Sequence, residues 1–157
     1  MPAYSNFIKQ GGKKKIAVLE ETISNDALDP EIKQAILAAI EKLKSQGHTI
    51  EYVSFDLLDY LVPAYYVLTT AEASSNLSRY DGVHYGYRDK DAKNLTSLYK
   101  LSRSEGFGEE VKRRILLGTF VLSAGYYDAY YQKAQQVRRL IREKVEALFQ
   151  NYDVLIS

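Results

Sequence analysis

The 157-residue chain has no cysteine and no tryptophan, and it has only two histidines. Without cysteine there is no disulfide, no thiol nucleophile and no thiolate ligand for a metal. His48 and His84 stand alone in the sequence, without the clustered ligands that a zinc site needs. The sequence therefore predicts a protein without a bound metal, and the absence of disulfides fits a cytoplasmic location.

The chain also lacks an excess of either charge: it has 21 Lys and Arg residues and 20 Asp and Glu residues, which gives a net charge of +1. Such a balance gives no general attraction to nucleic acid or to a membrane surface. No apolar run approaches the roughly 20 residues that cross a bilayer, and the N-terminus lacks the apolar stretch of a secretory signal. We therefore expect no membrane partner.

Tyrosine, in contrast, is abundant, with 14 residues, and the hydrophobic fraction of 46% is ordinary for a globular protein. A tyrosine ring buries a large apolar area, while its hydroxyl needs a partner or water. We expect most of these rings in a half-buried core layer; a cleft or a subunit interface is the alternative.

The first half of the chain has the pattern of a β-α-β unit. Residues 1–12 have no hydrophobic period and predict a flexible tail, which a strand at 16–19 follows. The Asp-Pro-Glu sequence at 29–31 is typical of a helix start, and Gly47 is typical of the end of that helix. A second strand is expected at 50–55. Two strands joined through a helix by short connections predict parallel neighbours with a right-handed crossover.

The second half is expected to be mainly helical, with helices at 57–77, 95–103, 109–125 and 127–150. The first of these helices is expected to have a break or its entry near Pro63. A polar loop is expected at 81–93 and a last strand at 153–157. Residues 13–157 thus predict a single α/β domain, in which several helices pack around the parallel strands. A strand that stops at the C-terminus is short for an internal position of a sheet, so we expect the natural chain to continue.

Two segments carry a family resemblance: AEASSNLSRYDGVHYGYR at 71–88 and SRSEGFGEEVKRRILLGTFVLSAGYYDAYY at 102–131. Through them the chain resembles the amidase signature family over about residues 13–157, and within it the glutamine-hydrolysing subunits of tRNA-dependent amidotransferases. The resemblance implies a partial amidase signature fold, part of a larger amidase domain. It also implies that a serine hydrolyses glutamine and that ammonia passes to a partner subunit, where ATP and Mg²⁺ support the conversion of Glu-tRNA(Gln) to Gln-tRNA(Gln).

The Ser–cis-Ser–Lys triad of that family is not recognisable in the chain. Ser74 and Ser75 lie on an expected helix without the glycines that would supply a close oxyanion-hole backbone, so we interpret them as small residues that allow close helix packing. We therefore expect no catalytic residue and no cofactor in this chain, and no amidase activity from it in isolation.

The resemblance implies substrate contacts from the pair Tyr65-Tyr66 and from an arginine of the KRR run that ends at Arg114. A guanidinium binds the α-carboxylate of glutamine through two parallel charge-assisted hydrogen bonds, and a phenol adds a neutral one. Arg113 and Arg114 point about 100° apart on a helix, so only one of them faces a given cleft. The motif favours Arg114, and Tyr65 over Tyr66. For Arg114, a surface ion pair with Glu110 is the alternative.

Two other functions stay open: a different amidase signature hydrolase, and a non-catalytic α/β binding module that is complete as it stands. A truncated amidase domain, unlike a complete module, would expose an apolar patch or bury that patch in a homodimer. The chain could also contact RNA phosphates through Arg138, Arg139 and Arg142, although the interspersed glutamates favour a solvated helix face.

Overall fold

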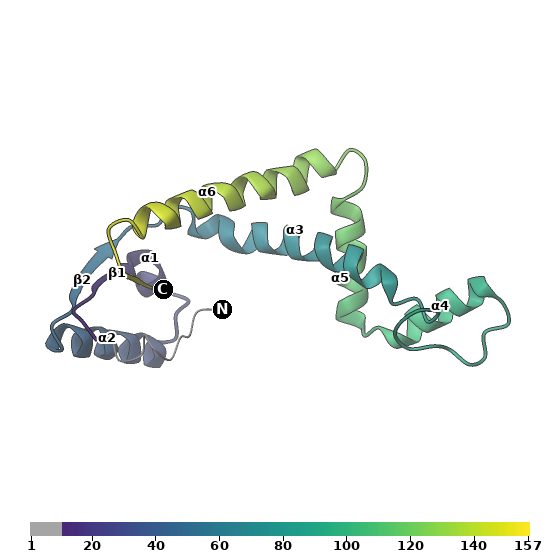
Figure 1. The fold of residues 1–157 in the computed structure, drawn as a ribbon, viewed down its shortest axis with the longest axis horizontal. Helices are drawn as coiled ribbons and strands as arrows, with labels where there is room; N and C mark the ends of the chain where they lie inside the picture. The colour runs from purple at the N-terminus through teal and green to yellow at the C-terminus, as the bar shows by residue number, and fades with distance from the viewer. Residues whose placement is uncertain (1–10) are drawn as a thin grey trace. The chain divides into compact units, whose positions relative to one another are not determined.

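The computed structural model describes residues 11–157, and its contacts divide the chain into two compact units (Figure 1). Unit one comprises the residues up to Leu58 together with Ile141–Ser157, and unit two comprises Asp59–Leu140. The expectation of one domain over residues 13–157 stays a prediction.

Unit one is built on a parallel sheet with the strand order β2-β1-β3. The strands are β1 (Lys15–Leu19), β2 (Thr49–Val53) and β3 (Val154–Ile156). The parallel pairing of β1 with β2 confirms the expected β-α-β unit. β1 also pairs in parallel with β3, whose residues Val154 to Ile156 lie in register with Ile16 to Val18. The expected tail, apart from its last two glycines, lies outside the described residues.

The helix α2 (Pro30–Ser45) lies beside this sheet (Figure 1). The Asp29 carboxylate accepts hydrogen bonds from the backbone N–H groups of Glu31 and Ile32, which confirms the predicted cap. The helix ends before Gly47, whose φ of +90° is favourable only without a side chain. A short helix that the sequence did not predict, α1 (Glu20–Ser24), supplies Ile23 to the core.

Helices and one loop make up unit two. The elements are α3 (Leu58–Asn76), η2 (Leu77–Arg79), α4 (Leu95–Gly106), α5 (Glu109–Val121), a π-helical segment η3 (Tyr127–Gln132) and α6 (Lys133–Leu148), which ends in unit one. The helix expected at 109–125 ends at Val121, and a turn that includes Gly125, at a φ of +86°, follows it. The helix expected at 127–150 begins instead as the π-helical segment. Pro63 is the sixth residue of α3 and does not end the helix, although its ring nitrogen cannot donate the hydrogen bond that an ordinary residue would make to the carbonyl of Asp59.

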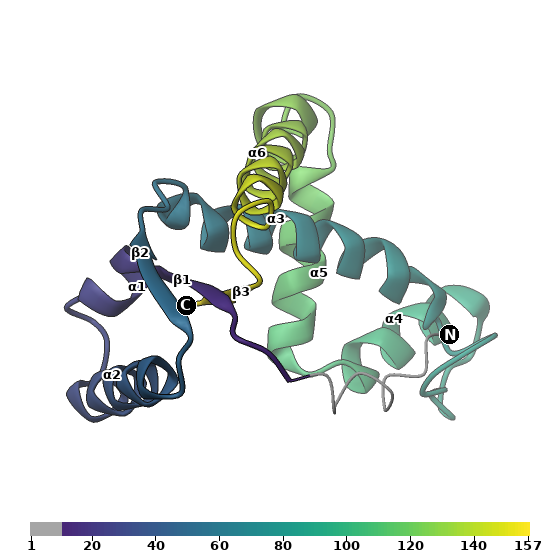
Figure 2. The same cartoon turned by 60° about the vertical axis from the view of Figure 1, so that its left-hand side comes forward.

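The helices α3 and α5 cross in close contact at Gly118 (Figure 2). A β-carbon built on Gly118 would lie 2.0 Å from the carbonyl oxygen of Thr70 and 2.7 Å from the β-carbon of Ser74. The crossing therefore brings backbone against backbone and requires glycine at this position. Since Ser74 is part of this contact, the structure confirms its predicted role in helix packing.

No helix among residues 11–157 combines the length and the apolar character that a membrane span requires.

Candidate functional site

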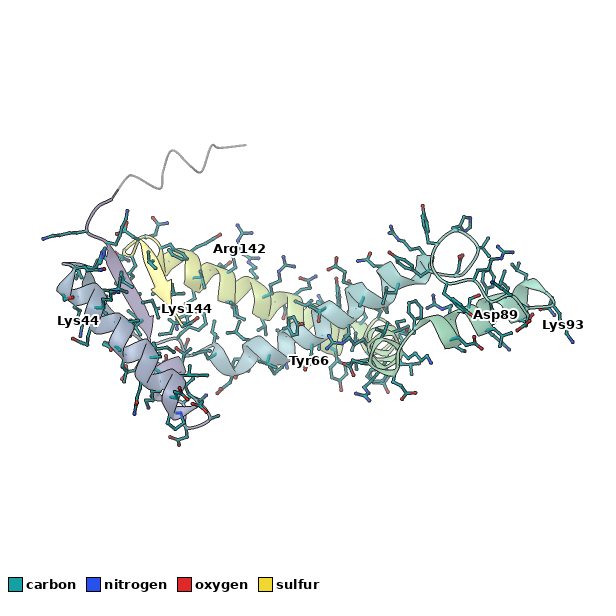
Figure 3. All side chains as sticks on the ribbon, turned by 90° about the horizontal axis from the view of Figure 1, so that it is seen from below. Lys44, Tyr66, Asp89, Lys93, Arg142 and Lys144 are labelled. Atoms are coloured by element: carbon teal, nitrogen blue, oxygen red, sulfur yellow. The ribbon has the colours of Figure 1, made fainter. Side chains whose placement is uncertain are left out.

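The crossing of α3 and α5 brings Arg114 beside Tyr66. Arg114 lies four residues before Gly118 on α5, and Tyr66 lies four residues before Thr70 on α3, so each is one turn from the crossing on the same helix face. The guanidinium carbon of Arg114 is 5.9 Å from the centroid of the Tyr66 ring. Tyr66 is labelled on α3 in Figure 3. This distance is that of a cation–π contact.

Glu110 holds one edge of the Arg114 guanidinium. The Nε atom of Arg114 donates to Oε1 of Glu110 at 3.0 Å, while Nη1 of Arg113 donates to Oε2 of the same carboxylate at 2.7 Å. The Arg113 side chain is 74% exposed and that of Arg114 is 35% exposed. The ion pair considered from the sequence is therefore present, and Arg114 is the arginine that lies beside the tyrosines.

Tyr65 and Tyr66 contact Arg114 in different ways. The two rings pack edge to face, with centroids 5.5 Å apart and planes at 72°. The Glu110 carboxylate, followed by the Tyr65 hydroxyl, raises the pKa of Arg114 above its ordinary value. Tyr66 thus offers the face of its ring and Tyr65 its hydroxyl, and both side chains remain about half exposed. That these three residues bind substrate stays a prediction.

Neither serine of the EASSN segment has the surroundings of a nucleophile. The Ser74 hydroxyl donates to the carbonyl of Ala71 at 3.0 Å, within its own helix. Within the part of the chain that the structure describes, no base is hydrogen-bonded to the hydroxyl of Ser74 or Ser75. The arrangement agrees with a packing role.

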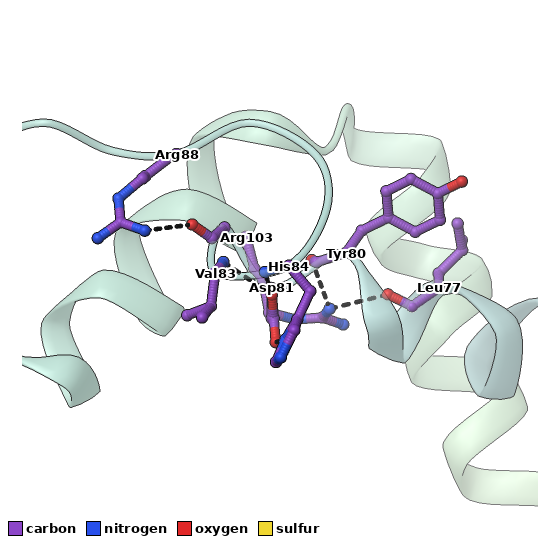
Figure 4. Close-up of polar contacts among 8 residues, drawn as sticks. Leu77, Tyr80, Asp81, Val83, His84, Arg88 and Arg103 are labelled. Atoms are coloured by element: carbon purple, nitrogen blue, oxygen red, sulfur yellow. Dashed lines mark hydrogen bonds and ion pairs between the residues drawn. The ribbon is translucent and has the colours of Figure 1, made fainter.

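The predicted polar loop that follows η2 is held by charged side chains (Figure 4). Arg103 of α4 donates through Nη1 to the carbonyl oxygens of Leu77 and Tyr80, at 2.9 and 3.1 Å. The Asp81 carboxylate accepts the N–H groups of Val83 and His84, at 2.8 and 3.0 Å. The bonds from His84 and Val83 lower the pKa of Asp81 to about 2. These contacts give the loop a defined backbone.

The histidines take part in local structure. Nδ1 of His84 lies 3.3 Å from Oδ2 of Asp81, and Nδ1 of His48 accepts the N–H of Lys14 at 3.0 Å. Among residues 11–157, no group of three or more His, Cys, Asp or Glu side chains is placed to hold a metal ion.

The basic face of α6 also carries an ion pair. Arg142 projects from the helix (Figure 3), and its Nε donates to Oε1 of Glu146 at 2.7 Å. An ion pair between residues four apart is typical of a solvated helix face. Contact between this face and RNA stays a prediction.

Unit two also has hollows that Arg114 does not line. One of about 590 Å³ lies between the loop and α4, from Arg88 to Leu98. An apolar one of about 190 Å³ lies between α3 and the start of α6. A third, of about 360 Å³, is lined by α3 residues that include Glu72 and by Tyr127 and Tyr131 of η3. Sequence analysis missed the third, although Glu72, Ser75 and Asn76 have the spacing of one helix face.

Comparison with known proteins gives a consistent result. The family model described as Amidase matches residues 2–157. Proteins named as the A subunit of glutamyl-tRNA(Gln) amidotransferase are 54% identical in Staphylococcus carnosus over 91% of this chain, 56% identical in Brevibacillus brevis over 90%, and 58% identical in Agathobacter rectalis over 84%. The crystal structure of the protein of that name from Thermotoga maritima is 35% identical, with a TM-score of 0.61 over 95% of this chain.

The chain spans less than a third of those relatives. It covers 29% of the Staphylococcus carnosus and Brevibacillus brevis proteins and 27% of the Thermotoga maritima chain. The likeness to that structure confirms that the mixed α/β fold is part of an amidase fold, as the sequence predicted.

Proposed function

The chain belongs to the amidase family, and we propose that it forms the wall of a glutamine-binding pocket in the glutamine-hydrolysing part of an amidotransferase. The observation that carries the proposal is the position of Arg114, with its charge held on α5 beside the Tyr65 hydroxyl and the Tyr66 ring. A glutamine substrate carries an α-carboxylate, which a guanidinium recognises through paired hydrogen bonds.

Each neighbour of Arg114 has a separate part in this recognition. Glu110 holds the Nε edge and the Tyr65 hydroxyl lies against the guanidinium, so the donors that these two groups do not engage are left to meet an incoming carboxylate. Tyr66 supports the plane of the cation through its ring, and the Tyr65 hydroxyl offers a neutral hydrogen bond next to it. A charge that is already oriented loses less conformational freedom when substrate binds, which favours binding.

The proposal assigns the remaining chemistry to parts outside this chain. The serine nucleophile and its lysine belong to the rest of the amidase domain, and ATP and Mg²⁺ belong to a partner subunit that converts Glu-tRNA(Gln) to Gln-tRNA(Gln) in the cytoplasm. The isolated chain is then inactive towards glutamine. The names of the relatives, at 53–58% identity, favour this function over hydrolysis of another amide and over a non-catalytic module.

A chimera provides the test: this chain replaces the segment that it matches in the Staphylococcus carnosus protein, and the product is assembled with the partner subunits of that organism. Amidation of Glu-tRNA(Gln) is measured with glutamine or with ammonium as nitrogen donor. Arg114→Ala should lower kcat/KM for glutamine about 100-fold, because a charged partner of the carboxylate is lost. Activity with ammonium, which carries no carboxylate, should change little.

Arg113→Ala is the matched control, because it removes the neighbouring cation and the other ion pair of Glu110. It should leave both activities close to those of the parent chimera. Equal losses with glutamine and ammonium in Arg114→Ala would contradict the binding role. An inactive parent chimera would contradict the assignment to this enzyme.

A further inference from the structure

The hollow of about 360 Å³ between α3 and η3 has a negative side that no cation among residues 11–157 neutralises. Glu72 lies on its rim, and the one hydrogen bond found for this carboxylate in the described part of the chain comes from the amide of Asn76, at 3.4 Å. No described lysine or arginine lines the hollow. An anion without a cation beside it is available for a positively charged ligand.

Two aromatic residues of η3, Tyr127 and Tyr131, also line the hollow. The Tyr127 and Tyr131 rings have centroids 5.0 Å apart and planes inclined at 36°. Gln135 donates to the Tyr131 hydroxyl at 3.0 Å, which fixes one ring. The faces of phenol rings attract cations through their quadrupole. The π-helical hydrogen bonding of η3, a backbone form frequent at functional sites, sets the positions of both rings.

The remaining lining residues define the shape and polarity of a suitable ligand. The Ser75 hydroxyl and the Asn76 amide are neutral polar groups on the α3 side, while Ala71 and Leu122 provide apolar surface. A primary ammonium group has three N–H donors for such oxygen acceptors. A short aliphatic chain would cover the apolar part.

We propose that this hollow binds a small primary alkylammonium ion, held between the Glu72 carboxylate and the rings of Tyr127 and Tyr131. The site is distinct from that of Arg114, since Arg114 does not line the hollow and a carboxylate cannot attract an anionic substrate group. The charge of the ligand, rather than its apolar chain, is the main determinant of binding.

The test uses the full 157-residue chain, labelled with ¹⁵N, and follows backbone amide shifts during titration with n-propylammonium chloride. Saturable shifts should be confined to residues 71–76 and 122–131. Propionate and n-propanol, which have the same chain length but a negative or no charge, should give no saturable shifts there. Equal effects of all three compounds, or no saturable binding of n-propylammonium, would overturn the proposal.

Glu72→Gln is the informative variant, because it removes the charge while the amide oxygen can still accept from Asn76. Glutamine is also about as good a helix former as glutamate, so α3 should remain folded. The dissociation constant for n-propylammonium should rise about fivefold. Glu109→Gln, a loss of charge on α5 away from the hollow, should leave it unchanged. If Glu72→Gln binds as tightly as the parent chain, the carboxylate does not hold the ligand.

Discussion

The charged groups Glu21 in unit one and Arg114 in unit two differ in how completely the protein satisfies them. Both oxygens of Glu21 accept the N–H of Phe55, at 2.8 and 2.9 Å, and Oε1 also accepts the hydroxyl of Ser54. Those bonds, with Ser54 first and Phe55 second, lower the pKa of Glu21. Arg114 also has a pKa shifted in favour of its charged form, yet Glu110 engages only one edge of its guanidinium.

The difference shows that a shifted pKa does not by itself identify a binding residue. Glu21 joins the end of β1 to the segment after β2, and its hydrogen-bonding capacity serves the fold. Arg114 keeps donors and exposed surface that the fold does not use, which is what recognition of a ligand requires.

The largest effect on stability is expected at Gly118, where the crossing of α3 and α5 positions Arg114 beside the tyrosines. Gly118→Ala places a β-carbon against the Thr70 carbonyl and should cost about 2 kcal/mol of unfolding free energy, even after the gain of about 1 kcal/mol in helix propensity. Gly12→Ala, where nothing lies within 4 Å, should change stability by less than about 0.5 kcal/mol. Urea denaturation measures both. Equal midpoints for the two variants would mean that the helices do not cross so closely.

A smaller effect on stability, which depends on pH, is expected for substitution of Glu21. Because its pKa is lower in the folded state than the ordinary value of 4.5, its ionised form stabilises the fold above that pH. This contribution is lost as the pH falls through the lower, folded-state pKa. Glu21→Gln should therefore lower the urea midpoint at pH 7, and the difference from the parent chain should shrink in acid.

Glu20→Gln, next to it on α1, is the matched control for the loss of one negative charge. Its midpoint should stay close to that of the parent chain at both pH values. A difference for Glu21→Gln that is constant from pH 7 to the acid range would contradict the role of the ionised carboxylate.

Sequence alone predicted the features that depend on local rules. Asp29 as a helix cap, Gly47 after the helix and the parallel β1–β2 pair follow from residues near one another in the chain. The π-helical start at Tyr127 could not be predicted, because the apolar spacing that continues into α6 resembles that of an ordinary helix.

The candidate site was predictable in its residues but not in its geometry. The choice between Arg113 and Arg114 depends on which face of α5 packs on α3. Gly118 marks that face, because it allows close contact with α3, and Arg114 lies four residues before it on the same face. The hollow beside Glu72 was missed because its two sides come from segments about fifty residues apart, and their approach depends on the path of the chain between them.

The most direct measurement follows the ¹⁵Nε–H resonance of Arg114 in the chimera during titration with L-glutamine and with 4-aminobutanamide. The second compound keeps the amide and the amine of glutamine but lacks the α-carboxylate. The account predicts that L-glutamine shifts this resonance with saturation and that 4-aminobutanamide does not. Equal shifts with both compounds, or no shift with L-glutamine, would contradict recognition of the substrate carboxylate by Arg114.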